Sequence, residues 1–222
     1  MNNACFSEDK KAELYRLRHF FFDLDGTLAD SKADVLGSIA QAYERLGWDY
    51  DASKLRIGPL LPDIIAAISP QLDAAQRQTV AQTFRAFYTA GKYSRTVLFP
   101  GVRAFMERLA AQGKTLYLAT NKPRKSTLEV LDVLGIRDCF MYIGTPDFDG
   151  DHLPKPEVLK AMVRMFDIDP AQAVMVGDTV PDIEAGRYAG MKTMAFTGGY
   201  GGADFATESR ADFVIHTYEE LL

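Results

Sequence analysis

The chain has 222 residues, of which 47% are hydrophobic and 25% are charged, so it is long enough to bury a core without disulfide or metal staples. Its 30 acidic and 25 basic residues give a formal net charge of −5. Disorder and a disulfide scaffold are excluded, and a mildly acidic chain is a poor candidate for binding nucleic acid.

The first 18 residues lack the apolar core of a secretion signal, and a short helix over residues 12–17 is one interpretation of them. Cys5 and Cys139 lie far apart and fit no metal spacing, which favours free thiols in a reducing compartment. No apolar stretch approaches the roughly 20 residues that span a bilayer. We therefore expect a cytoplasmic protein without a membrane partner.

Six short apolar runs stand out along the chain, and the first four end abruptly in small or acidic residues. They lie at residues 20–22, 115–119, 140–143, 173–176, 193–196 and 213–215. Continuous apolar runs of this length are typical of strands that are buried on both faces of a parallel sheet.

Between these runs, apolar residues recur at helical spacing. The helical patterns cover residues 102–109, 128–134, 158–166 and 183–190. Gly135 is placed to end the second of them. Strands that alternate with single helices predict a doubly wound α/β sheet with right-handed crossovers.

The interval 34–97 breaks the alternation, because it contains helical patterns and no convincing central strand. Apolar residues share one helical face over residues 35–46, and further patterns lie at 64–68 and 80–88. We therefore predict a helical domain of residues 34–97, inserted into an α/β core made of residues 1–33 and 98–222.

Ligands of open α/β sheets bind beyond the carboxyl ends of the strands, where several polar residues of this chain are expected to meet. These are Asp23 and Asp25, Thr120 and Asn121, Asp178 and Asp182, with Lys155 in the loop before the fourth strand. Asp23 and Asp25 share one face of their strand, and paired carboxylates near a phosphate indicate a divalent cation such as Mg²⁺. Gly26 allows close backbone approach, and Thr27 is suited to capping.

Each motif also has a purely structural interpretation. The DLDGT segment fits a strand that ends in a solvated turn, and Thr120 with Asn121 fits a helix cap. Lys155 fits an exposed loop lysine, and Asp182 fits a helix N-cap. The order of the four motifs along the strands is far more specific than any one of them.

Together the motifs resemble those of the haloacid dehalogenase-like hydrolase superfamily, in particular its phosphatases with a helical cap inserted after the first motif. The matching segments are DLDGT at 23–27, Thr120, Lys155 and GDTVPD at 177–182. DIEAGRYAGMKT, the glycine-rich GGYGG and ADFVI resemble phosphoglycolate phosphatases and their relatives. The resemblance covers nearly all of residues 19–222 and implies a Rossmann-like core with a cap.

The resemblance implies roles for the two acids of the first motif. Asp23 is expected to be the nucleophile that forms an aspartyl-phosphate. Asp25 is expected to protonate the leaving oxygen and then to activate water. Asp23, the backbone carbonyl of Asp25 and Asp178 are expected to bind Mg²⁺, with Asp182 in support.

The same resemblance implies a phosphoryl site. Thr120 and Lys155 are expected to hold the phosphoryl oxygens. Gly26, Thr27 and Asn121 are expected to contact the substrate. The cap is expected to move on hinges near residues 29–32 and 96–100.

These roles predict a Mg²⁺-dependent phosphatase of small phosphorylated metabolites, similar to phosphoglycolate phosphatase. The dehalogenases and phosphonate hydrolases of the superfamily lack an acid equivalent to Asp25, and the latter need a cap lysine, for which Lys54 and Lys92 are available. A nucleotidase, a sugar phosphomutase and a non-catalytic phosphate-binding regulator stay open alternatives. A monomer and a homodimer are both compatible with the sequence.

Specificity is expected to lie in the cap, where the resemblance is weakest. The IGPL segment at residues 57–60 resembles a segment of phosphoglycolate-phosphatase-like and nucleotidase-like relatives, and Arg56 directly precedes it. We predict that Arg56 binds the carboxylate of a substrate such as phosphoglycolate. A solvated arginine on a cap turn is an equally good interpretation.

Overall fold

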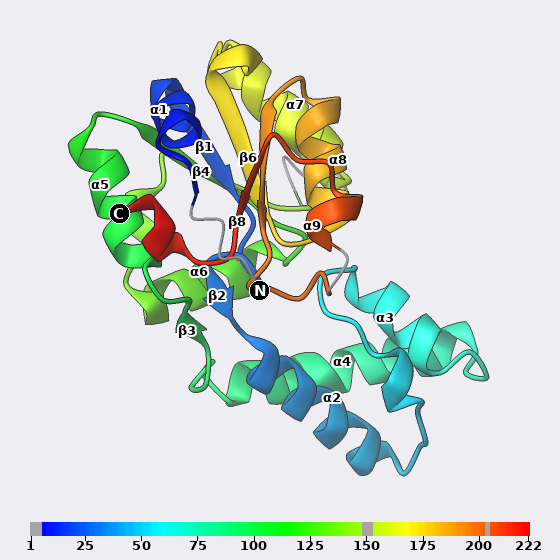
Figure 1. Ribbon diagram of the computed structural model, residues 1–222. Helices are drawn as coiled ribbons and strands as arrows, with labels where there is room; N and C mark the ends of the chain where they lie inside the picture. Colours follow the sequence, from blue (N-terminus) through cyan, green and yellow to red (C-terminus); the bar gives the residue numbers. More distant parts are fainter. Residues whose placement is uncertain (1–5, 148–152, 203–204) are drawn as a thin grey trace.

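The structure is a computed structural model that describes residues 6–147, 153–202 and 205–222 (Figure 1). Within this part of the chain, six parallel strands form a sheet in the order β5-β4-β1-β6-β7-β8. The strands are β1 (His19–Phe22), β4 (Thr115–Ala119), β5 (Tyr142–Gly144), β6 (Ala173–Gly177), β7 (Lys192–Phe196) and β8 (Phe213–Ile215). The chain adds β4 and β5 on one side of β1 and the last three strands on the other, which confirms the doubly wound α/β fold.

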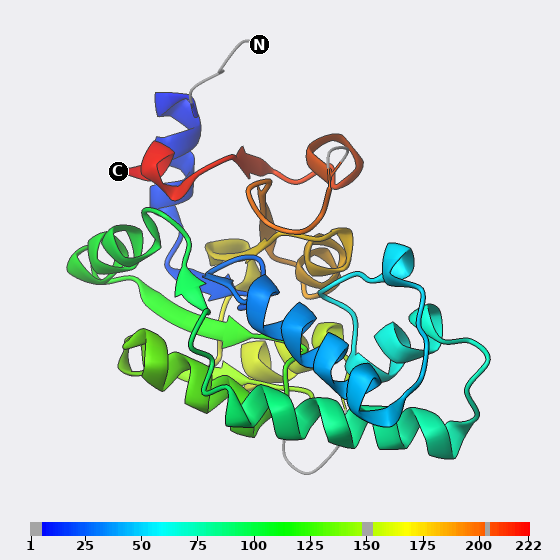
Figure 2. The same cartoon turned by 90° about the horizontal axis from the view of Figure 1, so that it is seen from below.

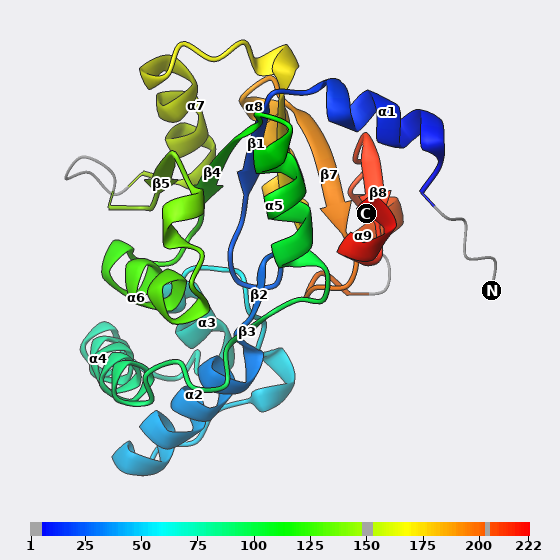
Figure 3. The same ribbon diagram turned by 90° about the vertical axis from the view of Figure 1, so that its left-hand side faces the viewer.

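Helices cover both faces of this sheet. They are α1 (Glu8–Arg16), α5 (Val102–Ala111), α6 (Arg124–Leu134), α7 (Lys155–Met165), α8 (Val180–Tyr188) and the short α9 (Phe205–Glu208). Phe20 and Phe22 of β1 share a core with α5 and α6, whereas Phe21 packs with α7 and α8 on the opposite face. Figure 3 shows α5 in front of β1. Burial of β1 on both faces explains why its sequence is uninterruptedly apolar.

The helix predictions for the core agree with these bounds. Each predicted pattern overlaps one helix, and α6 ends at Gly135, whose positive φ of 63° is the left-handed conformation that glycine tolerates. The 3-10 turns are η1 (Ala52–Lys54), η2 (Arg137–Cys139), η4 (Pro170–Gln172) and η5 (Tyr218–Leu221). Cys139 is exposed and free, while Cys5 lies outside the described residues. Among the described helices, none combines the length and the apolar character needed to cross a membrane.

Three further helices form the insert between the first and second core strands along the chain. They are α2 (Lys32–Leu46), α3 (Leu61–Ile68) and α4 (Ala74–Ala90). Figure 1 shows them together beyond the carboxyl ends of the sheet strands, and Figure 2 shows α2 and α4 from below, lying across that end. Helices α2 and α4 pack on one another through a core that includes Ile39, Tyr43, Val80 and Phe84.

Two short strands connect the insert to the core. β2 (Ala29–Asp30) pairs antiparallel with β3 (Val97–Leu98), a feature that the sequence analysis did not predict because each strand has only two residues. Next to them, the buried carboxylate of Asp34 accepts hydrogen bonds from the backbone N–H of Arg95 at 3.0 Å and from the hydroxyl of Thr96 at 2.8 Å. Both chain connections are thereby held together at one place.

Candidate active site

The polar motif residues meet at the carboxyl edge of the sheet, as the topology of a parallel sheet requires. Asp23 and Asp25 follow β1, Thr120 follows β4, and Asp178 follows β6. Lys155 differs from its predicted loop position, because it is the first residue of α7. Pro154 and Pro156 flank it, and a proline in the first turn favours the start of a helix there.

Lys155 is buried between two carboxylates. Its Nζ lies 2.7 Å from Oδ1 of Asp23 and 2.5 Å from Oδ1 of Asp182, and all three side chains are at most 9% exposed. Burial alone would lower the pKa of Lys155, but the negative charges of Asp182 and Asp23 outweigh it and raise that pKa above its usual value. The alternative of an exposed loop lysine is therefore wrong.

Asp23, Asp178 and Asp182 form an acid cluster, in which one carboxylate oxygen from each residue lies within 4.8 Å of the others. Burial raises the pKa of Asp23 to about 6, with Lys155 opposing the rise and Asp182 adding to it. Burial and the two neighbouring acids also raise the pKa of Asp178. One lysine facing three carboxylates leaves an excess of negative charge, and an oxygen-only donor set of this kind suits a hard divalent cation.

Asp178 is oriented by two donors from different loops. The hydroxyl of Thr27 donates to Oδ1 at 2.9 Å, and the backbone N–H of Tyr200 donates to Oδ2 at 2.7 Å. The approach is so close that a Cβ on Gly26 would lie 2.3 Å from Oδ2, and a Cβ on Gly199 would lie 2.1 Å from the carbonyl oxygen of Gly26. Glycine is therefore required at both positions for the loops to reach the acid cluster.

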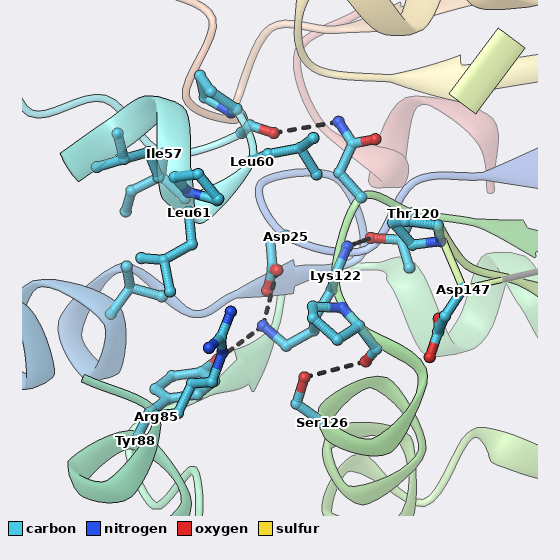
Figure 4. A pocket seen from close by; sticks show the side chains of 18 of the residues that line it. Asp25, Ile57, Leu60, Leu61, Arg85, Tyr88, Thr120, Lys122, Ser126 and Asp147 are labelled. Carbon is cyan, nitrogen blue, oxygen red and sulfur yellow. Dashed lines mark hydrogen bonds and ion pairs between the residues drawn. The ribbon is translucent and has the colours of Figure 1, made fainter. Parts of the chain in front are cut away.

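Asp25 points away from the acid cluster toward a lysine that the sequence analysis did not single out. Lys122 Nζ donates to Oδ2 of Asp25 at 2.8 Å and to the hydroxyl of Tyr88, in α4 of the insert, at 2.8 Å (Figure 4). Lys122 is buried, and its ammonium also lies 4.7 Å from the centre of the Tyr88 ring. The available signal was its position two residues after Thr120, within the TNKP segment.

A cavity of about 650 Å³ opens between the insert and the carboxyl edge of the sheet. Its core side includes Asp23, Asp25, Thr120, Asn121 and Lys122. Its insert side is mainly apolar and includes Ile57, Leu60, Leu61, Ile64, Phe84 and Tyr88. The two sides also touch directly, since Nδ2 of Asn121 donates to the carbonyl of Gly58 at 3.3 Å.

Arg56 is exposed and is not among the residues that line this cavity. Its guanidinium donates to the carbonyl oxygens of Ser53 at 3.0 Å and Leu55 at 2.9 Å, which are parts of its own loop. The predicted contact between Arg56 and a substrate carboxylate stays a prediction.

Comparisons with known proteins agree with this arrangement. The profile of the family described as haloacid dehalogenase-like hydrolase matches residues 20–196. The chain belongs to this family. The resemblance drawn from the motifs is thereby confirmed. The family and the curated phosphoglycolate phosphatase relatives together indicate that the protein is a phosphoric monoester hydrolase.

Among those relatives, a phosphoglycolate phosphatase of Vibrio vulnificus is 32% identical over 212 residues, which are 90% of this chain and 92% of the relative. A tyrosine-protein kinase PtkA of Mycobacterium bovis is 30% identical over 205 residues, 90% of this chain and 69% of the relative. A solved haloacid dehalogenase-like hydrolase of Streptococcus pneumoniae superposes with a TM-score of 0.82 at 28% identity, covering 93% of this chain and 97% of its own.

Proposed function

We propose that this phosphatase hydrolyses small phosphomonoesters with the help of Mg²⁺, through an aspartyl-phosphate formed on Asp23, as its phosphoglycolate phosphatase relatives suggest. The observation that carries the proposal is the position of Asp23, which belongs to the acid cluster, pairs with Lys155 and lines the cavity. Asp23 therefore lies within reach of a cation, of an ammonium that suits phosphoryl oxygens, and of a substrate.

The two oxygens of Asp23 have different surroundings, which supports its role as nucleophile. Oδ1 accepts a hydrogen bond from Lys155, whereas Oδ2 accepts none within the described residues. In the first step Asp23 attacks phosphorus, and the bond between phosphorus and the leaving oxygen breaks. In the second step water attacks phosphorus, the bond to Asp23 breaks, and inorganic phosphate leaves. Each displacement is easier than direct hydrolysis.

Asp25 has the geometry of the acid and base for these two steps. Lys122 holds its Oδ2, while Oδ1 is buried and has no hydrogen-bond partner within the described residues. Oδ1 is therefore the atom that donates a proton to the leaving oxygen and later accepts one from the attacking water. Asp25 also lines the cavity, where the ester oxygen of a substrate would lie.

The chemistry of the acid cluster fits Mg²⁺, which prefers a few carboxylate oxygens together with phosphate oxygens. We assign Asp23, Asp178 and the backbone carbonyl of Asp25 as its ligands. Asp182 supports the cluster, because its two oxygens already accept hydrogen bonds from Lys155 and from the backbone N–H of Thr179. Bound Mg²⁺ would offset the negative charge that the carboxylates and the phosphoryl group bring together.

The remaining motif residues complete the phosphoryl site in this proposal. The Oγ1 of Thr120 accepts the backbone N–H of Lys122 at 3.2 Å, which leaves its hydroxyl hydrogen available for a phosphoryl oxygen. Lys155 and the side chain of Asn121 lie at the same edge, and Gly26 and Thr27 form the turn after Asp25. Residues 34–97 act as the cap that excludes water from this site.

Phosphate release from para-nitrophenyl phosphate and phosphoglycolate, measured with Mg²⁺ and with a chelator, tests the proposal. We expect release with Mg²⁺, its loss in chelator and its return when Mg²⁺ is restored. Full turnover in chelator contradicts the metal role, and no turnover on either ester contradicts the phosphatase proposal. A wider panel with nucleotides and sugar phosphates separates the alternatives within the superfamily.

A further inference from the structure

The cavity as a whole is larger, and its insert side is more apolar, than phosphoglycolate requires. The cavity of about 650 Å³ lies within the range of roughly 300–1,000 Å³ typical of pockets for drug-sized ligands, whereas glycolate is a two-carbon acid. Leu60 is one of the residues that line the cavity, and it is 42% exposed. Leu61, Ile64 and Phe84 extend the apolar surface behind it.

Arg85 is the only charged residue that the insert contributes to the lining of the cavity. It is exposed, and it makes no hydrogen bond or ion pair within the described residues. It belongs to α4, three residues before Tyr88, and Figure 4 shows both side chains on the side of α4 that faces Lys122 and Asp25 of the core. A guanidinium in an apolar wall is a specific binding group for a carboxylate, because it offers two parallel donors.

The two lysines that line the cavity, Lys122 and Lys125, are poor alternatives to Arg85 for binding a substrate anion. Lys122 already pairs with Asp25 and Tyr88. Lys125 lies on the core side of the cavity together with Glu129 and Asp147. The two negative charges of these acids outweigh the single positive charge of Lys125. The positive charge that faces the leaving group is therefore that of Arg85.

We propose that the preferred substrate is a phosphomonoester whose alcohol part is larger than glycolate, is mainly apolar and carries one carboxylate that Arg85 binds. This inference rests on the proposed phosphatase function and specifies its substrate class. The phosphoryl group lies at Asp23, the apolar body contacts Leu60, Leu61 and Ile64, and the single carboxylate balances the single guanidinium. Because Arg85 is the one charged group on the insert side, a second phosphate on the substrate is not required for charge balance there.

The test compares three esters whose leaving alcohols are all ordinary primary alcohols. They are phosphoglycolate, benzyl phosphate and carboxybenzyl phosphate, the last as its meta and para isomers because the reach of Arg85 selects between them. We expect the highest kcat/KM for one carboxybenzyl isomer. In the Arg85→Gln variant that value falls by roughly 10- to 150-fold, as expected for loss of a charge-assisted contact, while benzyl phosphate changes little.

A second variant tests the apolar wall. Leu60→Ser should lower kcat/KM for benzyl and carboxybenzyl phosphate by about tenfold and spare phosphoglycolate. Each variant has a matched control outside the cavity. Arg45→Gln, at an exposed insert arginine, is the control for Arg85→Gln, and Val133→Ser, at an exposed residue of α6, is the control for Leu60→Ser; both should leave every kcat/KM unchanged.

The outcomes distinguish this inference from the phosphatase proposal. If no ester is hydrolysed with Mg²⁺, the proposed function fails. If phosphate is released but phosphoglycolate is the best substrate, the inference on substrate class is overturned and the function stands. Equal losses on benzyl and carboxybenzyl phosphate in Arg85→Gln overturn the role of Arg85, as does a selective loss in Arg56→Gln instead.

Discussion

Replacing Lys155 by methionine removes the ammonium that lies between two buried carboxylates while keeping much of the length of the side chain. The structure places Nζ 2.7 Å from Asp23 and 2.5 Å from Asp182, with Asp178 in the same acid cluster. Without metal, the three buried carboxylates of the acid cluster have no cation beside them in the variant. Removing one partner of a buried ion pair costs about 3–5 kcal/mol of the free energy of unfolding.

For a domain of this size, that loss corresponds to a fall in Tm of roughly 6 to 20 °C. The loss depends on pH. Burial raises the pKa of Asp23 from 3.8 to about 6 even though Lys155 opposes the rise, so removing Lys155 raises it further. A folded-state pKa above the unfolded one gives stability that is present at low pH and is lost as pH rises through the folded value. The deficit of Lys155→Met should therefore be smaller at pH 5 than at pH 8.

Thermal unfolding in chelator, at both pH values and for both proteins, measures this effect. Mg²⁺ added at pH 8 should recover part of the lost Tm, because a cation bound to the folded state stabilises it. Lys54→Met is the control, since it breaks an exposed pair with Asp51 at 3.4 Å and should shift Tm little at either pH. A variant as stable as the parent at pH 8 in chelator, or a deficit that shrinks as pH rises, would refute the reasoning.

Three other substitutions test separate parts of the site. Asp23→Asn should lower kcat by roughly 10⁴-fold or more with Tm preserved, and near-normal turnover would mean a different nucleophile. Gly199→Ala places a Cβ 2.1 Å from the carbonyl oxygen of Gly26, so melting should show a loss of about 1–3 kcal/mol, and an unchanged Tm would contradict the close approach. Tyr200→Phe keeps the ring and the backbone N–H but loses the hydroxyl contact with Asp30, so kcat and KM should change while the affinity for Mg²⁺, measured by calorimetry, stays the same.

The strands of the core were predictable because burial on both faces leaves a direct pattern in the sequence. The apolar runs at 115–119 and 213–215 coincide with β4 and β8. The run at 140–143 begins two residues before β5, which is Tyr142–Gly144. Phe140 follows the 3-10 turn η2 and is buried in the core, so its sequence resembles that of a strand residue. Buried turn residues and buried strand residues have the same composition, so the sequence alone does not separate them.

The catalytic motifs were predictable for a different reason, since each follows a strand and their order along the chain is specific. The partners of those motifs were not. Lys122 reaches Asp25 across 97 residues, and Tyr200 reaches Asp30 across 170. Tyr88 is buried in the insert, as its helical spacing predicted, yet its hydroxyl contacts Lys122 of the core. Local patterns carry no information about contacts that only the tertiary fold creates.

Tyr200 shows what such contacts achieve for the whole site. Its backbone N–H orients Asp178, whereas its hydroxyl donates to Asp30 at 2.8 Å and accepts the backbone N–H groups of Ser31 and Lys32 at 2.9 and 3.0 Å. Helix α2 begins at Lys32, so one residue touches both the acid cluster and the start of the insert. Any rotation of the insert about this connection must break or move the hydroxyl contacts. Tyr200 therefore links the connection between core and insert to the loop whose backbone N–H orients Asp178.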